Sequence, residues 1–124
     1  MGAIEKIQCN NCKKSWEIMT GMGKKHATLA NISELYPVNV AEQLTKYERM
    51  PGVRFQFAMT PAKCETCKSI VAVPVVFMKT DEKKYTGFCP ECGKSVQTFS
   101  CADRCKCPAC NEKKLFKNII GRWD

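Results

Sequence analysis

Four Cys-x-x-Cys pairs are the residues of this chain whose type and spacing could do chemistry. A pair of cysteines separated by two residues places both sulfur atoms within reach of one small cation, and two pairs complete a tetrahedral site. Eight thiolates are therefore enough for two zinc ions, each held in a closed structural site of four sulfurs. The pairs are Cys9 and Cys12, Cys64 and Cys67, Cys89 and Cys92, and Cys107 and Cys110.

Two other uses of ten cysteines in 124 residues fit the sequence less well. A disulfide framework suits a secreted protein, but residues 1–8 contain no apolar segment of a secretory signal. A thioredoxin-like pair begins a helix within a βαβ unit, whereas the segments around these pairs have the pattern of strands. We therefore expect a zinc protein of a reducing compartment, the cytoplasm.

The sequence leaves open which pairs share a metal. Pairing in chain order is favoured, because the fourteen residues between Cys92 and Cys107 approach the usual spacing of a zinc ribbon. The alternative is nested, with the first pair joining the fourth and the second joining the third. The entropy of loop closure grows slowly with length and does not decide between them.

Cys101 and Cys105 are left over after the four pairs. They are candidates for alternate metal ligands or for a redox-sensitive pair, because Arg104 and Lys106 would lower the pKa of a nearby thiol. The alternative is two spare thiols in a turn beside the metal.

The segments that must position these pairs have the sequence patterns of strands and of one helix. These patterns predict a small, metal-stabilised, mostly β (α+β) fold. One helix is expected near 40–50, where Val40, Leu44 and Tyr47 share a face after a cap at Asn39. Alternation and β-branched residues predict strands, with an edge position or a bulge at Pro74. The expected strands lie at 4–18 on both sides of the first pair, and at 53–59, 69–78, 85–88, 94–100 and 114–117.

Two very small domains are expected. Residues 1–78 would form a first zinc ribbon with a helical insertion and 79–124 a second ribbon, with one compact unit as the alternative. Such short segments bury a thin core, so we expect folding to depend on the metal.

The charge of the chain indicates nucleic acid only weakly. Twenty basic and twelve acidic residues give a net charge of +8, and two zinc ions with eight thiolates would reduce it to about +4. Two phenylalanines of the 53–59 strand could stack on bases, although one buried strand face is the commoner reason for them. The candidate nucleic-acid contacts are Lys24, Lys25, Arg54, Phe55 and Phe57.

Catalysis and membrane insertion are not expected. His26 is the only histidine, and a catalytic zinc usually takes histidine or carboxylate ligands and keeps an open position. No small-molecule substrate is indicated. The longest apolar run, 70–78, is nine residues and contains a proline, which is too short to span a membrane.

The segments 89–93 and 107–110 resemble the knuckles of zinc ribbons, which are rubredoxin-like. The layout of the chain is also similar to that of small uncharacterised bacterial proteins with several zinc ribbons. Lys13 and Lys68 stand where glycine is usual, and two cysteines are additional. The resemblance implies zinc and the ribbon fold, and no particular activity. The matching residues are the cysteine pairs, Gly21 to Gly23, Tyr36, Pro37, Trp123 and Asp124.

Two functions are compatible with these observations. The first is a protein-interaction module held by two structural zinc sites, with the helix or the apolar strand at 70–77 offered to an unknown protein partner. The alternative is a nucleic-acid-binding zinc ribbon that contacts DNA or RNA. Redox sensing through Cys101 and Cys105 is a third and weaker expectation.

Overall fold

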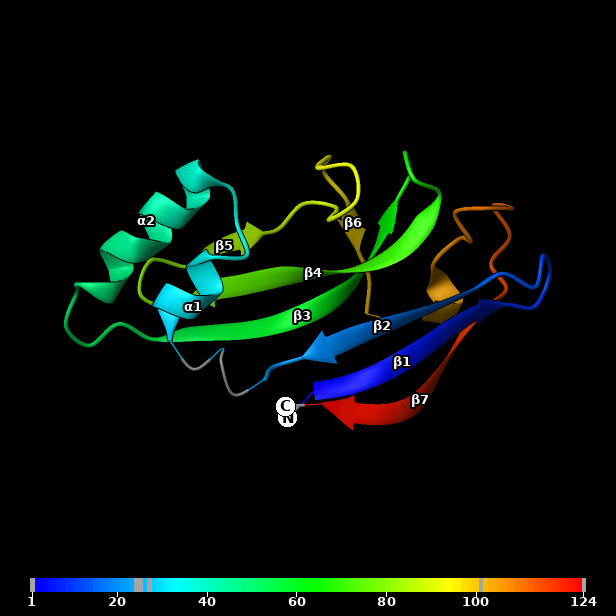
Figure 1. Ribbon diagram of the computed structural model, residues 1–124, viewed down its shortest axis with the longest axis horizontal. Coiled ribbons are helices and arrows are strands. Elements are labelled where there is room, and N and C mark those ends of the chain that lie inside the picture. Colours follow the sequence, from blue (N-terminus) through cyan, green and yellow to red (C-terminus); the bar gives the residue numbers. More distant parts are fainter. Residues whose placement is uncertain (1, 24–25, 27, 101, 124) are drawn as a thin grey trace.

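The computed structural model describes residues 2–23, 26, 28–100 and 102–123, and within them the protein is mostly β. Its strands form one antiparallel sheet in the order β5-β4-β3-β2-β1-β7, with β6 beside β3 (Figure 1). The strands are β1 (Gly2–Cys9), β2 (Ser15–Gly21), β3 (Phe55–Cys64), β4 (Ser69–Met78), β5 (Lys83–Thr86), β6 (Gln97–Thr98) and β7 (Leu115–Trp123). The helices are α1 (Leu29–Ser33), α2 (Val38–Glu48) and the 3-10 helix η2 (Ala102–Arg104).

Two hairpins carry the first two cysteine pairs at their turns. Strands β1 and β2 pair up to Gln8 and Ser15, directly beside the turn that contains the first cysteine pair. Strands β3 and β4 pair up to Cys64 and Ser69, so the second cysteine pair occupies the connecting turn. The strand predicted at 69–78 is confirmed. Strands also lie on both sides of the first cysteine pair, as predicted, but with different bounds.

Each hairpin gains a third strand from the C-terminal part of the chain. Strand β7 follows the fourth cysteine pair and runs beside β1, with Cys9 opposite Leu115. Strand β6 follows the third pair and runs beside β3, with Lys63 opposite Gln97. Each hairpin with its added strand is called a ribbon below, and the ribbon of β3, β4 and β6 comes between β2 and β7 of the other in the sequence.

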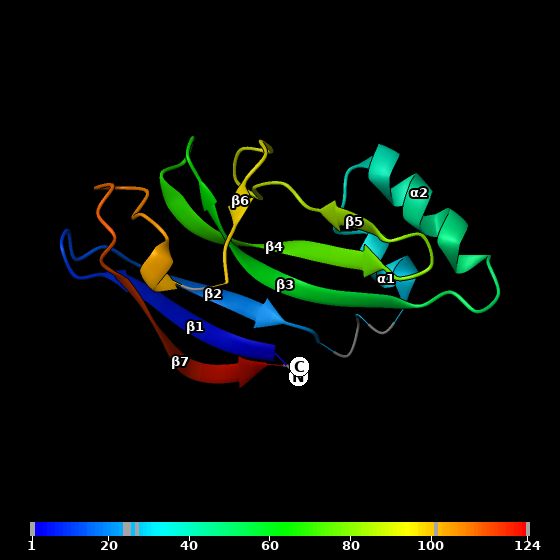
Figure 2. The same ribbon diagram turned by 180° about the vertical axis from the view of Figure 1, so that it is seen from behind.

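Little backbone pairing connects the two ribbons. Strands β2 and β3 are joined in the sheet through one residue pair, Gly21 and Met59. Figure 2 shows β1, β2 and β7 on one side of this junction, and β3 and β4 running on toward the helices. Side chains, more than the sheet ladder, must therefore connect the ribbons.

The helices cover one face of the β3–β4 hairpin. Leu44 and Tyr47 of α2 are buried against Phe57, Val76 and Met78, as the apolar stripe of this segment predicted. Within the described residues, no helix has the length and apolar character needed to cross a membrane.

The predicted start of the helix was wrong by two residues. Helix α2 begins at Val38, and its N-cap is Pro37, whose carbonyl accepts the amide of Ala41 at 2.8 Å. Proline needs no amide partner at a helix start, and its fixed φ suits this position, so Asn39 is not used as the cap.

Pro74 was predicted to lie at an edge of the sheet. It has no strand partner on the β5 side of β4, although β4 itself is not an edge strand. Strand β4 lies between β3 and β5, but its pairing with β5 extends only from Val75 to Met78. Pro74 therefore lies just beyond the β5 ladder, where its missing N–H leaves no ladder partner unsatisfied.

Replacing Leu44 tests whether the helices are held by this packing. Leu44 is fully buried, so we expect Leu44→Ala to lower the free energy of unfolding by about 2–5 kcal/mol through lost burial and a cavity. Urea denaturation of the metal-loaded protein measures this. The control is Val38→Ala on the same helix, where the side chain is 75% exposed and the change should be small; equal losses would contradict the packing argument.

Candidate metal centres

The eight paired cysteines form two clusters that could each hold a metal ion. In each cluster all four sulfur atoms lie within 4.8 Å of one another. Two Sγ–Sγ separations between the paired turns are 3.6 and 3.7 Å in one cluster, and two are 3.5 and 3.9 Å in the other. A tetrahedral zinc ion with four sulfurs at about 2.3 Å requires sulfur separations of about 3.8 Å, whereas a disulfide requires about 2.05 Å.

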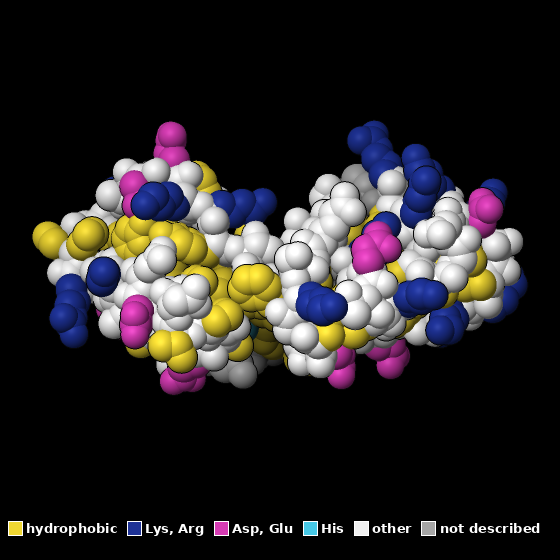
Figure 3. Space-filling view, turned by 90° about the horizontal axis from the view of Figure 1, so that it is seen from above, with side chains coloured by type: hydrophobic (Ala, Val, Ile, Leu, Met, Phe, Trp, Pro, Cys, Tyr) yellow, Lys and Arg dark blue, Asp and Glu magenta, His cyan; other side chains and the backbone are white. Residues whose placement is uncertain are grey.

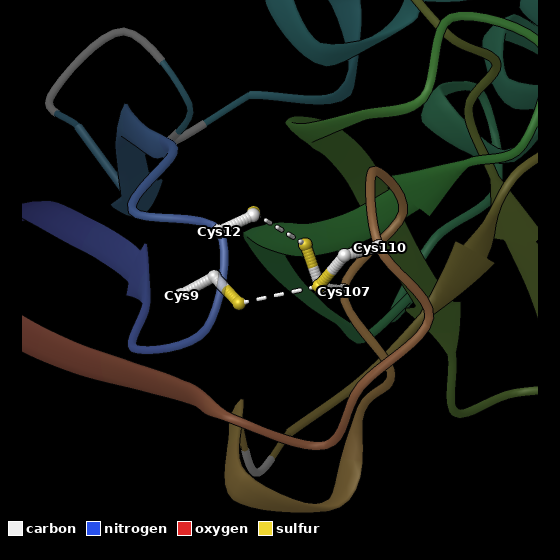
Figure 4. A group of neighbouring side chains, drawn as sticks. All are labelled: Cys9, Cys12, Cys107 and Cys110. Carbon is white, nitrogen blue, oxygen red and sulfur yellow. Dashed lines mark hydrogen bonds between the residues drawn. The ribbon is translucent and has the colours of Figure 1, made fainter.

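The pairing is nested, so the pairing in chain order expected from the sequence was wrong. Figure 4 shows Cys9 facing Cys110 and Cys12 facing Cys107, which joins the first cysteine pair to the last. The other cluster contains Cys64, Cys67, Cys89 and Cys92. Each cluster thus combines a pair from residues 1–78 with a pair from 79–124, because β7 pairs with β1 and β6 pairs with β3.

Backbone hydrogen bonds give the knuckles a common shape. In three of them the amide of the first cysteine donates to the carbonyl five residues later, and the amide four residues later donates back, all at 2.8–3.0 Å. The residue after each second cysteine has positive φ, the conformation that glycine adopts most readily. These residues are Lys13 (66°), Lys68 (51°), Gly93 (74°) and Asn111 (65°).

The two cysteines of each pair differ in burial. The first cysteine of every pair is buried, and the second is partly or fully exposed. Around the first site the buried side chains include Ile7, Ile18 and Leu115, with Trp16 partly buried against them. Apolar residues of β3 and β4 surround the second site. The apolar shell protects the inner sulfurs from water and from exchange.

The thiols of each cluster differ in their tendency to ionise. The Cys67 amide donates to the sulfur of Cys64 at 3.4 Å and lowers the pKa of that thiol to about 7. A hydrogen bond from Asn11 lowers the pKa of Cys110 to about 6. Burial raises the pKa of Cys107 to about 12, because a buried thiolate loses its hydration, and hydrogen bonds with the Cys12 and Cys110 thiols raise it further. The arrangement therefore suits a divalent ion.

The extra cysteines do not join these clusters as far as the structure describes them. Cys105 belongs to neither group of four sulfurs. Burial raises the pKa of the Cys105 thiol, which is a correction to the lowering expected from Arg104 and Lys106. Both of these basic side chains are exposed, so their charges are screened by water. Cys101 lies outside the described residues.

The described residues among those predicted to contact nucleic acid differ in exposure. Lys24 and Lys25 lie outside the described residues. Arg54 is exposed just before β3, whereas Phe57 is 8% exposed and belongs to the core under the helices. Phe55 is half-buried beside that core. The buried-face explanation therefore holds for Phe57, whose ring is not available for base stacking.

His26 is buried away from both clusters. Its ring lies 4.6 Å from the ring of Phe57 and 5.8 Å from that of Trp123, between centroids. Its Nδ1 accepts the Gly23 amide at 3.0 Å. The packing places this histidine in the junction between the ribbons.

One apolar groove was not foreseen from the sequence. It encloses about 560 Å³ and lies over β3 and β4. The alternation of both strands could have indicated it, because Ala58 and Val75 are paired on the face opposite Phe57 and Val76. The groove is lined by Met22, Phe55, Gln56, Phe57, Ala58, Thr60, Val75 and Phe77.

Comparisons of the chain with protein families, with curated proteins and with solved structures gave no match.

Paired cysteine variants test the nested arrangement with Co²⁺ as a spectroscopic probe. Cys9→Ser with Cys107→Ser damages one cluster, so the chain should still bind one ion, whereas Cys9→Ser with Cys64→Ser damages both and should bind none tightly. Thiolate-to-cobalt absorption and native mass spectrometry count the ions. Pairing in chain order predicts the opposite result for the two variants.

Proposed function

We propose that this protein is a zinc-binding, non-catalytic interaction module in which two four-cysteine sites hold two nested ribbons. The observation that carries the proposal is the match between the sulfur separations, 3.5–3.9 Å, and the edge of a zinc–sulfur tetrahedron. Four cysteines fill the coordination sphere and leave no open position for a substrate, which favours a structural role.

Zinc is the ion that this ligand set favours. Four thiolates in a tetrahedron are typical of zinc or of iron–sulfur centres. The proposal requires a reducing compartment such as the cytoplasm, because oxidation to disulfides would remove the ligands.

The interaction role is supported by the apolar groove over β3 and β4. Val75 and Phe77 are half-buried and line it without a covering element. Figure 3 shows hydrophobic side chains gathered on the helix-bearing lobe at the left, with charges of both signs around them. The groove itself fits an apolar segment of a protein partner, which would bury this area from water. Binding to nucleic acid is the second candidate, and a basic pocket described below favours it.

Metal analysis tests the structural role. We expect two zinc ions per chain, and we expect chelation to abolish cooperative unfolding, because zinc binding to such sites contributes roughly 10–16 kcal/mol in apparent terms. Acidification should also release zinc, since protons compete for the same sulfurs and the affinity falls as the pH is lowered. Elemental analysis, circular dichroism and a pH series measure these effects.

Cys105→Ser is the matched control, because this thiol lies outside both clusters, and it should keep both ions. Iron with visible absorption in place of zinc, or a cooperative fold that survives complete metal removal, would contradict the proposal.

Phe77→Ser tests the groove. The change removes an apolar side chain from the lining, so a bound protein should be lost or its affinity weakened about tenfold or more, the scale of a central contact in an interface. Quantitative affinity capture compares the wild type, this variant and Val38→Ser, which alters an exposed side chain outside the groove. Captured proteins that are identical for all three chains would count against the groove.

A further inference from the structure

A small basic pocket of about 290 Å³ lies between the two ribbons. Four of its lining residues are cationic, and among the lining residues that the structure describes none is acidic. The cations come from three parts of the sequence that only the nested fold brings together. The pocket is lined by Lys63, Gln97, Thr98, Phe99, Arg104, Cys105, Lys106 and Lys113.

Both ribbons build the pocket. Strand β6 pairs with β3, so Gln97 lies opposite Lys63, and the amide of Phe99 donates to the carbonyl of Pro61 at 3.1 Å. On the other side, the amide of Cys105 donates to the carbonyl of Ala102 at 3.1 Å and closes the turn of η2. The pocket walls are thus tied to the segments that lead into each cysteine cluster.

Lys63 is the least exposed cation of the pocket. Its side chain is 11% exposed, and its Nζ lies 3.0 Å from a carboxylate oxygen of Glu65, whose own side chain is 70% exposed. An ion pair with an exposed carboxylate contributes little in water. A second anion could therefore share or replace Glu65 as the partner of this ammonium group.

The remaining cations lie at the rim. Arg104, Lys106 and Lys113 are exposed, and none of them has an ion-pair partner among the described residues. A guanidinium and several ammonium groups around one small volume suit a phosphate group, which accepts bidentate and charge-assisted hydrogen bonds. Gln97 and Thr98 add neutral side-chain donors, and Phe99 adds an aromatic surface.

A simpler reason for these cations is charge compensation. Each filled four-cysteine site would carry a charge of about −2, and Lys63 and Lys106 directly precede Cys64 and Cys107. That reason explains cations near the sulfurs. It does not require that all four line the same pocket, nor that an aromatic residue and two polar residues accompany them.

We infer that this pocket binds a phosphate group carried by a nucleotide, either free or within a single nucleic-acid strand. The inference goes beyond the structural zinc sites and the apolar groove, which lies elsewhere on the fold. It also replaces Lys24, Lys25, Arg54, Phe55 and Phe57 as the place where a nucleic acid would contact the chain.

The test uses the zinc-loaded full chain and a fluorescein-labelled single-stranded oligonucleotide at low salt, read by anisotropy. The rim variant combines Arg104→Gln, Lys106→Gln and Lys113→Gln. The matched control, with the same loss of charge on the helix-bearing part, combines Lys46→Gln, Lys79→Gln and Lys83→Gln. The rim variant should weaken binding about tenfold or more, and the control less than about twofold.

Competition distinguishes the two sources of phosphate. Displacement of the probe by a nucleoside monophosphate supports a free nucleotide, and displacement by unlabelled oligonucleotide alone supports a strand. Absence of binding at low salt overturns the inference, and so does equal weakening by the rim and control variants, which would indicate net charge alone.

Cys105 supplies a second readout because its thiol lines the pocket. Saturating ligand should slow the alkylation of Cys105 by iodoacetamide about threefold or more, as a covered thiol is less accessible to the reagent. Site-resolved mass spectrometry measures the rate, and an unchanged rate at saturation contradicts the proposed location. Metal content, checked for every variant, separates a failure of this inference from a failure of the zinc sites.

Discussion

Four sulfur atoms can surround one ion only if two separate turns of backbone face each other at a fixed distance. In this chain each pair of facing turns is set by a third strand that pairs with the hairpin bearing the first turn, β7 with β1 and β6 with β3. Lys13 and Lys68 have positive φ, a conformation that is unfavourable for lysine. This conformation closes the turn of each knuckle, so it serves the same requirement. The apolar clusters beside the sulfurs are small, so the packing there depends on the sulfurs being held together.

The features that could be predicted from the sequence are those with local signatures. The spacing of Cys64 and Cys67 identified a knuckle, and the i, i+4, i+7 stripe of Val40, Leu44 and Tyr47 identified the buried helix face. The nested pairing was only the alternative because it depends on Leu115 reaching Cys9, and no local pattern specifies which distant strand pairs with β1. The basic pocket was missed for the same reason, since Lys63 and Lys113 are fifty residues apart in sequence.

The junction between the ribbons is made mainly by side chains. Trp123 Nε1 donates to the carbonyls of Ala3 and Thr20, at 3.1 and 2.9 Å, and ties the end of β7 across both strands of the first hairpin. His26 then lies between Trp123 and Phe57 and connects this hairpin to the core under the helices. Glu5 is buried in the same ribbon, where it accepts the Thr20 hydroxyl and pairs with Lys117 at 3.2 Å. The polar contacts brace the first ribbon, and the aromatic contacts of His26 supplement the single backbone pair at Gly21 and Met59.

The insertion of one ribbon inside the other also fixes an order of events during synthesis. The inserted ribbon has all four of its cysteines once Cys92 has emerged from the ribosome, whereas Cys9 must wait for Cys110, which lies 101 positions later. At bacterial to eukaryotic elongation rates of 5–20 residues per second, that delay is roughly 5–20 s. During this interval the first knuckle is an open pair of thiols on a nascent chain. The β1–β2 hairpin is therefore made before the inserted ribbon, but its four-cysteine cluster is completed after that of the inserted ribbon.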